Sequence, residues 1–262
     1  MELHTAEALV LDVMDLHDYD RILTFLTRWQ GKKRGVARGA RRKYSRFGGQ
    51  LQPLAKVSVT WHEKAGRDLG RISSVEMIRA AESLQQDLEG LLLSAYLRDH
   101  MLEFAQENEP GDHMYRLLDS TTEALLAGVD RDLATRYFEA WVLRLAGVFP
   151  APTDCPECGR SLLDRGAVLP VMAEGLVCGD CGGRAEKVSR DVLEFLLRIG
   201  GESLQKMAQS PPPLATLKKV DKLCAAVRRR FLQHELKSYQ VVRETMESLD
   251  RSQVIDLQAT DS

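Results

Sequence analysis

The chain has 262 residues, of which 44% are hydrophobic and 28% are charged, and this composition is typical of a globular protein with a sizeable core. It contains no apolar run of about 18 residues, which excludes a helix that spans a membrane. The first five residues include Glu2 and lack the basic and then apolar layout of a signal peptide, so we expect a cytoplasmic protein.

The net charge of -2 conceals an uneven distribution of charge along the chain. Residues 1–80 hold 15 Lys and Arg against 9 Asp and Glu, whereas residues 81–262 hold 21 against 29. A basic front part and an acidic rear part indicate that a polyanion binds mainly at the front.

Short β-strands are predicted throughout the first 80 residues. Val57, Val59 and Trp61 alternate with polar residues, which is the period of a half-buried strand. Further strands are predicted at residues 8–14, 21–29, 32–40 and 69–78. Five short strands in so short a stretch suggest a small closed barrel, and the OB-fold is a barrel of this kind that binds nucleic acid. We therefore expect an OB-fold DNA-binding domain over residues 1–80.

A dense basic stretch without any acidic residue lies within the predicted barrel. Its cations are Lys32, Lys33, Arg34, Arg38, Arg41, Arg42, Lys43 and Arg46. A charge run is usually a solvated face, but such density without counter-charge is self-repulsive unless a polyanion binds. Tyr44 and Phe47 are interleaved with the last cations, and guanidinium groups beside aromatic rings suit single-stranded nucleic acid. Glycines that would let the backbone approach phosphates stand at positions 31, 35 and 39.

After residue 80 the apolar residues recur with a helical period. The spacing predicts four helices, which include residues 88–105, 138–145, 192–199 and 220–231. The prolines at 211, 212 and 213 must interrupt the helices between residues 200 and 214. We expect a helical domain over residues 81–247 and a frayed tail over residues 248–262.

The last predicted helix carries a second set of cations. These are Lys218, Lys219, Lys222, Arg228, Arg229 and Arg230, which project away from the apolar stripe or flank it. The set is either an ordinary solvated helix face or a second contact surface, which could receive DNA or an acidic peptide from a partner.

Four of the five cysteines form two close pairs, Cys155 with Cys158 and Cys178 with Cys181, separated by 19 residues. This spacing is typical of a zinc site, and disulfides are rare in the cytosol. Gly159 and Gly182 follow the two pairs and would permit the positive φ of a metal-binding knuckle. The cysteines therefore predict a zinc finger inserted in the helical domain at about residues 150–186.

Four thiolates complete the tetrahedral shell of Zn(II) and leave no open position for water or substrate. The spacing thus favours a structural zinc over a catalytic one. The fifth cysteine, Cys224, lies on the apolar stripe of its helix and is predicted to be a buried, inert thiol. The sequence also lacks the Walker, nucleophile-elbow, zinc-protease and dinucleotide-binding motifs. We therefore expect a binding protein with no catalytic residue.

Three stretches of the sequence resemble the RecO family of bacterial recombination mediators: residues 7–54, residues 137–159 and residues 231–244. The most specific elements are the Asp-Arg-Ile-Leu run at Asp20 to Leu23 and the Gly-Ala-Arg-Arg-x-x-Ser-Arg-Phe-Gly-Gly run at Gly39 to Gly49.

The resemblance implies an α+β protein with an N-terminal OB-fold β-barrel, followed by an α-helical domain that contains an embedded four-cysteine zinc finger. It implies binding of single- and double-stranded DNA, annealing of complementary strands, and loading of the RecA recombinase with the partner RecR in the RecF pathway. The RecA filament would form on DNA coated by single-strand-binding protein (SSB), whose acidic C-terminal tail contacts the helical domain. A nucleoid-associated location follows.

Position by position, the family's DNA-contacting residues match the cations from Lys32 to Arg46, with Arg38, Arg41 and Arg42 as the first candidates. The zinc ligands match the four paired cysteines. Two other classes of protein stay open at this point. A zinc-ribbon transcription regulator would bind duplex DNA with sequence specificity, and a hydrolase with an unrecognised acidic site would degrade DNA in the presence of a divalent metal.

Overall fold

The structure is a computed structural model that describes residues 2–64, 66, 69–149, 151–170 and 175–245. The chain divides into two compact units. The first comprises the residues up to Tyr115 together with those from Glu235 onward, and the second comprises Arg116–His234. The predicted tail at residues 248–262 lies outside the described residues. Among the described residues, no helix is both long and apolar enough to span a bilayer.

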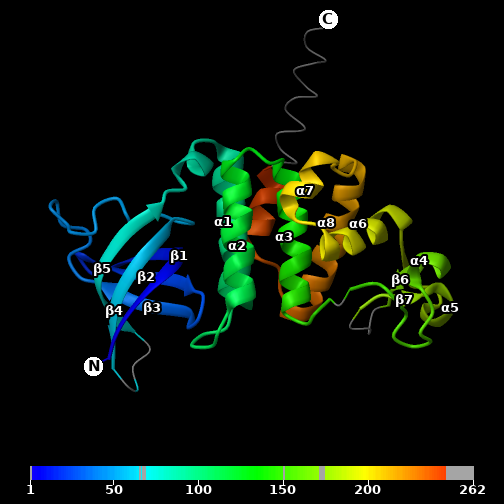
Figure 1. The fold of residues 1–262 in the computed structure, drawn as a ribbon, viewed down its shortest axis with the longest axis horizontal. Helices are drawn as coiled ribbons and strands as arrows, with labels where there is room; N and C mark the ends of the chain where they lie inside the picture. The colour runs from blue at the N-terminus through cyan, green and yellow to red at the C-terminus, as the bar shows by residue number, and fades with distance from the viewer. Residues whose placement is uncertain (1, 65, 67–68, 150, 171–174, 246–262) are drawn as a thin grey trace, which may run out of the picture. The chain divides into compact units, whose positions relative to one another are not determined.

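The first unit contains a closed barrel of five strands, drawn in blue to cyan in Figure 1. The strands are β1 (Glu2–Leu16), β2 (Asp20–Thr27), β3 (Gly31–Ala37), β4 (Lys56–Glu63) and β5 (Gly70–Arg79). They pair in the order β1-β2-β3-β5-β4, and β4 returns to β1. All neighbours are antiparallel except β3 and β5, which pair in parallel at Gly35 and Gly70. This is the OB-fold barrel that the sequence predicted.

The burial of β4 follows the predicted alternation. Val57, Val59 and Trp61 are fully buried in the barrel core, whereas the polar residues between them are partly exposed. The alternation of β2 is ragged because its last five residues are all buried. Leu23 and Phe25 belong to the barrel core, but Leu26 is buried outside it. Both faces of this strand are therefore covered.

Helix α1 (Leu88–Phe104) follows a short 3-10 turn, η1 (Glu82–Gln85), and packs on β1 within the first unit. Asp87 caps its N-terminus by accepting a hydrogen bond from the backbone N–H of Gly90 at 2.7 Å. The guanidinium of Arg98 donates to the carbonyl oxygen of Leu11 in β1 at 2.8 Å. Residues 237–245 are also helical and belong to this unit.

The second unit is built around α8 (Leu214–Leu232), which packs against α3 (Arg131–Leu145) and α6 (Arg190–Gly201). The proline tract separates α8 from α7 (Leu204–Gln209), a short helix that the sequence reading did not predict. Helix α2 (Asp112–Leu126) was also not predicted, and the boundary between the two units falls within it.

A small module of the second unit carries the paired cysteines. Its three strands, β6 (Ala167–Leu169), β7 (Val177–Cys178) and β8 (Glu186–Val188), form a sheet in the order β7-β6-β8. Two single-turn helices, α4 (Leu162–Arg165) and α5 (Gly179–Gly182), accompany the sheet. Figure 1 labels β6, β7, α4 and α5 of this module.

Candidate nucleic-acid interface and metal centre

The segment that joins β3 to β4 is anchored in the barrel core by Ala40, Phe47, Leu51 and Ala55. Ala40 and Phe47 are buried among the core residues, and the residues between them are exposed except for half-buried Ser45. The backbone N–H of Arg42 donates to the carbonyl of Gly39 at 3.1 Å, and that of Ser45 donates to the carbonyl of Arg42 at 3.0 Å. Residues 38–46, which we name the cationic loop, therefore form a series of hydrogen-bonded turns.

The cationic loop is also tied to the turn between β1 and β2. The backbone N–H of Gly39 donates to Asp20 Oδ1 at 2.8 Å, and that of Arg41 donates to the carbonyl of Tyr19 at 3.0 Å. The Arg41 guanidinium donates to the carbonyl of His17 at 3.1 Å. Two segments that are distant in the sequence thus form one surface at this end of the barrel.

Six of the eight predicted DNA-contacting cations are exposed. They are Arg34, Arg38, Arg41, Arg42, Lys43 and Arg46. Arg41 lies 3.5 Å from Asp15, but both side chains are more than a third exposed, so solvent weakens this ion pair. Because five of the six belong to the cationic loop, the structure concentrates positive charge there.

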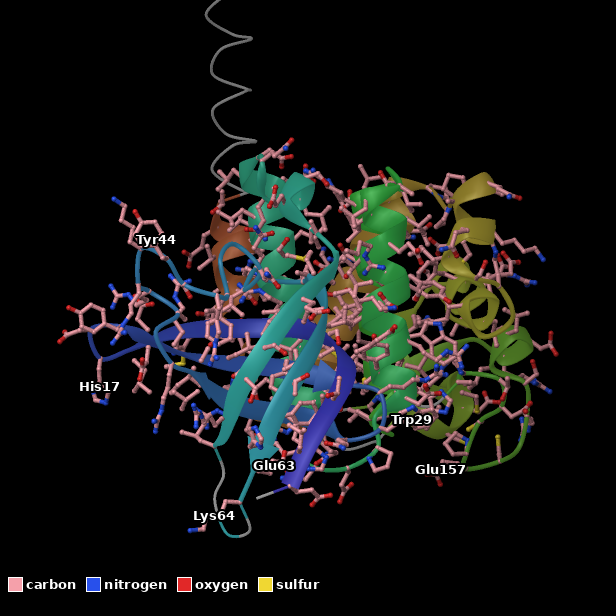
Figure 2. The ribbon with its side chains drawn as sticks, turned by 60° about the vertical axis from the view of Figure 1, so that its left-hand side comes forward. His17, Trp29, Tyr44, Glu63, Lys64 and Glu157 are labelled. Atoms are coloured by element: carbon pink, nitrogen blue, oxygen red, sulfur yellow. The ribbon has the colours of Figure 1, made fainter. Side chains whose placement is uncertain are left out.

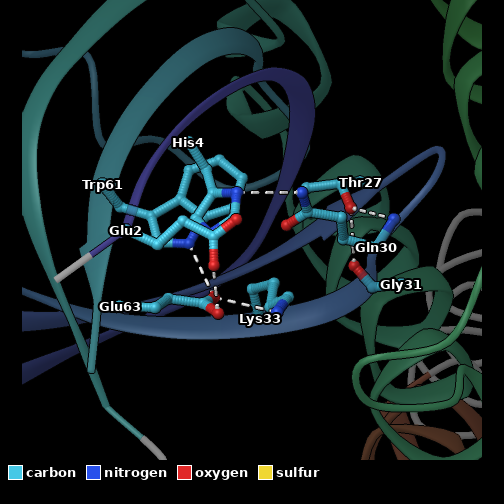
Figure 3. A network of polar contacts seen from close by, with 8 residues as sticks. All are labelled: Glu2, His4, Thr27, Gln30, Gly31, Lys33, Trp61 and Glu63. Atoms are coloured by element: carbon cyan, nitrogen blue, oxygen red, sulfur yellow. Dashed lines mark hydrogen bonds and ion pairs between the residues drawn. The ribbon is translucent and has the colours of Figure 1, made fainter. Parts of the chain in front are cut away.

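The other two predicted cations are only partly exposed. Lys33 forms an ion pair with Glu63 at 2.8 Å and its side chain is only 10% exposed, within the polar network that Figure 3 shows. The ammonium of Lys32 donates to the carbonyl of Leu102, and burial lowers the pKa of this lysine. Both ammonium groups have partners within the chain, which argues against the predicted DNA contact by Lys32 and Lys33.

The two predicted aromatic residues have different environments. The Tyr44 ring is 90% exposed, and Figure 2 shows it projecting from the cationic loop. The prediction that Phe47 offers a stacking surface was wrong, because its ring is fully buried in the barrel core. The sequence reading also missed Tyr19, which is 56% exposed and carries the Arg42 guanidinium at 5.3 Å from its ring centre. Its only signal in the sequence was a position between two predicted strands, residues 8–14 and 21–29.

The predicted role of Gly31 and Gly35 in phosphate contact was also wrong. A Cβ atom at Gly31 would lie 2.2 Å from the carbonyl oxygen of Glu109, and one at Gly35 would lie 2.5 Å from the Ile72 side chain. These glycines are therefore required for packing within the first unit. Gly39 has a φ of +73° and allows the turn that opens the cationic loop.

The second basic set is only partly exposed. Lys218, Lys222 and Arg229 are exposed on α8. Lys219 forms an ion pair with Asp191 at 3.0 Å, and Arg230 donates to the carbonyl of Pro170 at 2.8 Å. The two latter side chains therefore connect α8 to neighbouring segments of the second unit.

The assignment of Arg228 to a surface was wrong, because this residue is fully buried. Its guanidinium lies 3.6 Å from the equally buried carboxylate of Glu139 on α3. Arg136 lies 3.1 Å from the same carboxylate and also pairs with Asp221. Cys224 is fully buried nearby, and this burial, followed by the charge of Glu139, raises the pKa of its thiol, as expected of an inert cysteine.

The four paired cysteines come together as a potential metal site. The sulfur atoms of Cys155, Cys158, Cys178 and Cys181 all lie within 4.8 Å of one another. Those of Cys158 and Cys178 are 3.7 Å apart. Zn–S bonds of about 2.3 Å in a tetrahedron place the sulfur atoms about 3.8 Å apart, so the donor set and its spacing fit Zn(II).

Backbone geometry supports both cysteine pairs. The N–H of Cys178 donates to Cys155 Sγ at 3.3 Å, and this hydrogen bond contributes most to lowering the pKa of Cys155 to about 6. Gly159 has a φ of +69°, as predicted for a knuckle. In the second pair the positive φ belongs to Gly183, whereas Gly182 is needed because a Cβ there would lie 2.1 Å from Val168 Cγ2.

Comparison with known proteins covers both units. Residues 1–81 match the family described as Recombination protein O N terminal, and residues 85–240 match Recombination protein O C terminal. The chain belongs to the RecO family.

Individual members of the family align with most of the chain. The DNA repair protein RecO of Anaeromyxobacter sp. (strain K) is 32% identical over 209 residues, which is 78% of this chain and 82% of that protein. The DNA repair protein RecO of Desulforamulus reducens is 28% identical over 258 residues, or 96% of this chain and 97% of that protein. The family resemblance read from the sequence is therefore confirmed, and with it a role in DNA repair.

Proposed function

We propose that this RecO-family protein is a recombination mediator that acts by binding and does not catalyse a reaction. It binds single- and double-stranded DNA and anneals complementary strands. Together with RecR it helps to load RecA onto DNA coated by SSB. Residues 1–80 act as the DNA-binding domain and residues 81–247 as the helical domain, in the cytoplasm at the nucleoid.

The exposed cations of the cationic loop carry this proposal. They lie on an OB-fold barrel, a fold that commonly binds single-stranded nucleic acid, and they form a preorganised set because the loop is hydrogen-bonded at both ends. Annealing requires two polyanions to approach each other against their repulsion. Cations on the loop would screen that repulsion, and the exposed cations of α8 would contribute to the screening.

A structural zinc ion completes the proposal. Cys155, Cys158, Cys178 and Cys181 would hold it, and four thiolates leave no position at which the ion could activate water. When bound, the ion joins the two cysteine pairs and stabilises the small sheet of β6, β7 and β8.

A cavity in the second unit supports the proposed contact with the acidic tail of SSB. It has a volume of about 240 Å³ and lies beside α8. Apolar side chains of Val188, Val192 and Leu223 line it. Lys187 and Lys222 also line it, as do Glu186 and Lys219, which is paired with Asp191. Apolar walls beside lysines suit a peptide with both acidic and apolar side chains.

Annealing of complementary oligonucleotides by the full-length protein tests the proposed function. We expect the triple variant Arg38→Glu/Arg41→Glu/Arg42→Glu to lose annealing and to bind single-stranded DNA more weakly, because it reverses charge where phosphates would lie. The triple variant Lys218→Glu/Lys222→Glu/Arg229→Glu changes the net charge equally at exposed positions of α8. It should weaken annealing less than the loop variant does, because the α8 cations only supplement those of the cationic loop. Annealing that is unchanged in the loop variant would refute the assignment of this site.

A further inference from the structure

Two exposed tyrosines lie in or beside the cationic loop, and neither belongs to the buried core of the barrel. Tyr19 lies in the turn between β1 and β2 and is 56% exposed, and Tyr44 lies in the loop itself and is 90% exposed. The Arg42 guanidinium lies 5.3 Å from the centre of the Tyr19 ring, and the Lys43 ammonium lies 5.6 Å from that of Tyr44. Each ring thus combines an exposed apolar surface with an adjacent cation.

Backbone hydrogen bonds order the segments that carry the two rings. The carbonyl of Tyr19 accepts the N–H of Arg41 at 3.0 Å, so the turn and the cationic loop are joined beside the ring. Tyr44 precedes Ser45, whose N–H closes a turn with Arg42 at 3.0 Å, and Phe47 anchors the end of the segment in the core. A ligand would therefore meet two rings whose supporting backbone is already ordered, which lowers the entropic cost of binding.

We propose that Tyr19 and Tyr44 stack on unpaired nucleobases while the arginines of the cationic loop bind the phosphates of the same strand. The proposal rests on the DNA binding proposed above and deepens it. Every base has a π-face, so such stacking tolerates any sequence. In a duplex the bases are already paired and stacked on one another, so the two rings favour single strands over duplex DNA.

Trp29 provides a matched control within the same unit. It is 65% exposed and Arg28 lies 4.9 Å from its ring centre, but Arg28 is paired with Asp112. Trp29 lies in the turn between β2 and β3, well away from Tyr44 in Figure 2. It resembles the two tyrosines in exposure and differs from them in lying away from the cationic loop.

The test compares full-length wild-type protein with Tyr19→Ala, Tyr44→Ala, the two Tyr→Phe variants and Trp29→Ala. Fluorescence anisotropy measures Kd for a labelled oligothymidine, for an abasic phosphodiester strand of equal length, and for a duplex. We expect each Tyr→Ala variant to bind oligothymidine roughly 5- to 100-fold more weakly, which corresponds to the loss of one stacked base. Binding to the abasic strand and the duplex should be unchanged, as should the dependence of affinity on salt.

Both Tyr→Phe variants should bind as the wild type does, because stacking needs the ring and not the hydroxyl. Trp29→Ala should also bind as the wild type does. The proposal is overturned if Tyr→Ala variants keep wild-type affinity for oligothymidine, if they lose affinity equally for the abasic strand, or if Trp29→Ala loses as much. If the wild type binds none of the three ligands, the proposed function itself fails, and this outcome is distinct from the others.

Discussion

Gly31 opens β3 at a point where another segment of the first unit lies against it. Its φ of +62° is in the left-handed region, and a Cβ atom would lie 2.2 Å from the carbonyl oxygen of Glu109 and 2.6 Å from that of Gln106. The neighbouring N–H of Lys32 donates to the Gln106 carbonyl at 2.9 Å. Backbone atoms crowd this glycine from outside the hairpin, so a side chain cannot be accommodated by a change of rotamer.

We predict that Gly31→Ala destabilises the protein more than Gly48→Ala does. Both positions have a positive φ, which costs an alanine about 1–2 kcal/mol, but nothing lies within 4 Å of a Cβ at Gly48. In Gly31→Ala the clash with backbone atoms should lower the free energy of unfolding by a further amount of about 1–3 kcal/mol, the usual cost of overpacking. Urea unfolding of the two variants measures the difference, and equal free energies of unfolding would contradict the close approach of residues 106–109.

Among the helices, α2 was not predicted, although its buried residues Met114, Leu117, Leu118 and Leu125 recur with a helical period. Two adjacent threonines, Thr121 and Thr122, are fully buried on α2, and the Thr122 hydroxyl donates to the carbonyl of Leu118 at 2.8 Å. These threonines occupy two positions of the buried face and make its apolar spacing less obvious in the sequence. A hydroxyl that bonds to its own helix can be buried, so the threonines continue that face.

The module of β6, β7 and β8 is small. Its strands have only two or three residues each, and the cysteine pairs lie next to them. In small metal-dependent folds, zinc binding contributes about 10–16 kcal/mol. We therefore expect a zinc ion at this site to contribute much of the stability of the module, in addition to the burial of Leu162, Val168 and Leu169.

We predict that chelation of zinc, or Cys158→Ala, unfolds the segment of about residues 150–186 and lowers the melting temperature of the protein. Zinc content measured by mass spectrometry should fall together with the far-UV circular dichroism signal. Cys224→Ala serves as the control, because it removes a buried cysteine that is not part of the site and should retain zinc. Unchanged spectra and melting of the Cys158 variant would contradict a structural zinc.

For the whole molecule, the overall net charge of -2 says little about binding, since positive charge is concentrated locally. No Asp or Glu occurs from Arg21 to His62, a stretch that includes the cationic loop. The nearby carboxylates of Asp15 and Asp20 stand at the end of β1 and the start of β2, where they accept hydrogen bonds from the cationic loop or pair with arginines. A polyanion would thus meet a strongly positive surface on a nearly neutral protein.

We predict that the affinity of the full-length protein for single-stranded DNA falls steeply with salt. Six exposed cations that each neutralise one phosphate give a slope of log K against log salt of about -4, or roughly a 300-fold loss between 50 and 200 mM. In the triple variant of Arg38, Arg41 and Arg42 this slope should become less steep, from about -4 to about -2. An affinity that does not change with salt would be incompatible with phosphate binding by the cationic loop.

Features that repeat locally along the chain were readable before any fold was known. Alternation identified β4, the helical period identified α1, α3, α6 and α8, and the cysteine spacing identified the potential metal site. Which side chains of these elements reach solvent became clear only from the packing of the folded chain. Lys33 forms an ion pair with Glu63 and Arg228 lies beside Glu139, and both carboxylates are distant in the sequence. Tyr19 lies beside the cationic loop because its turn is hydrogen-bonded to Arg41 of that loop. The period of apolar residues predicts which face of a helix or strand is buried. The exposure of a single side chain also depends on which residues of other elements pack against it.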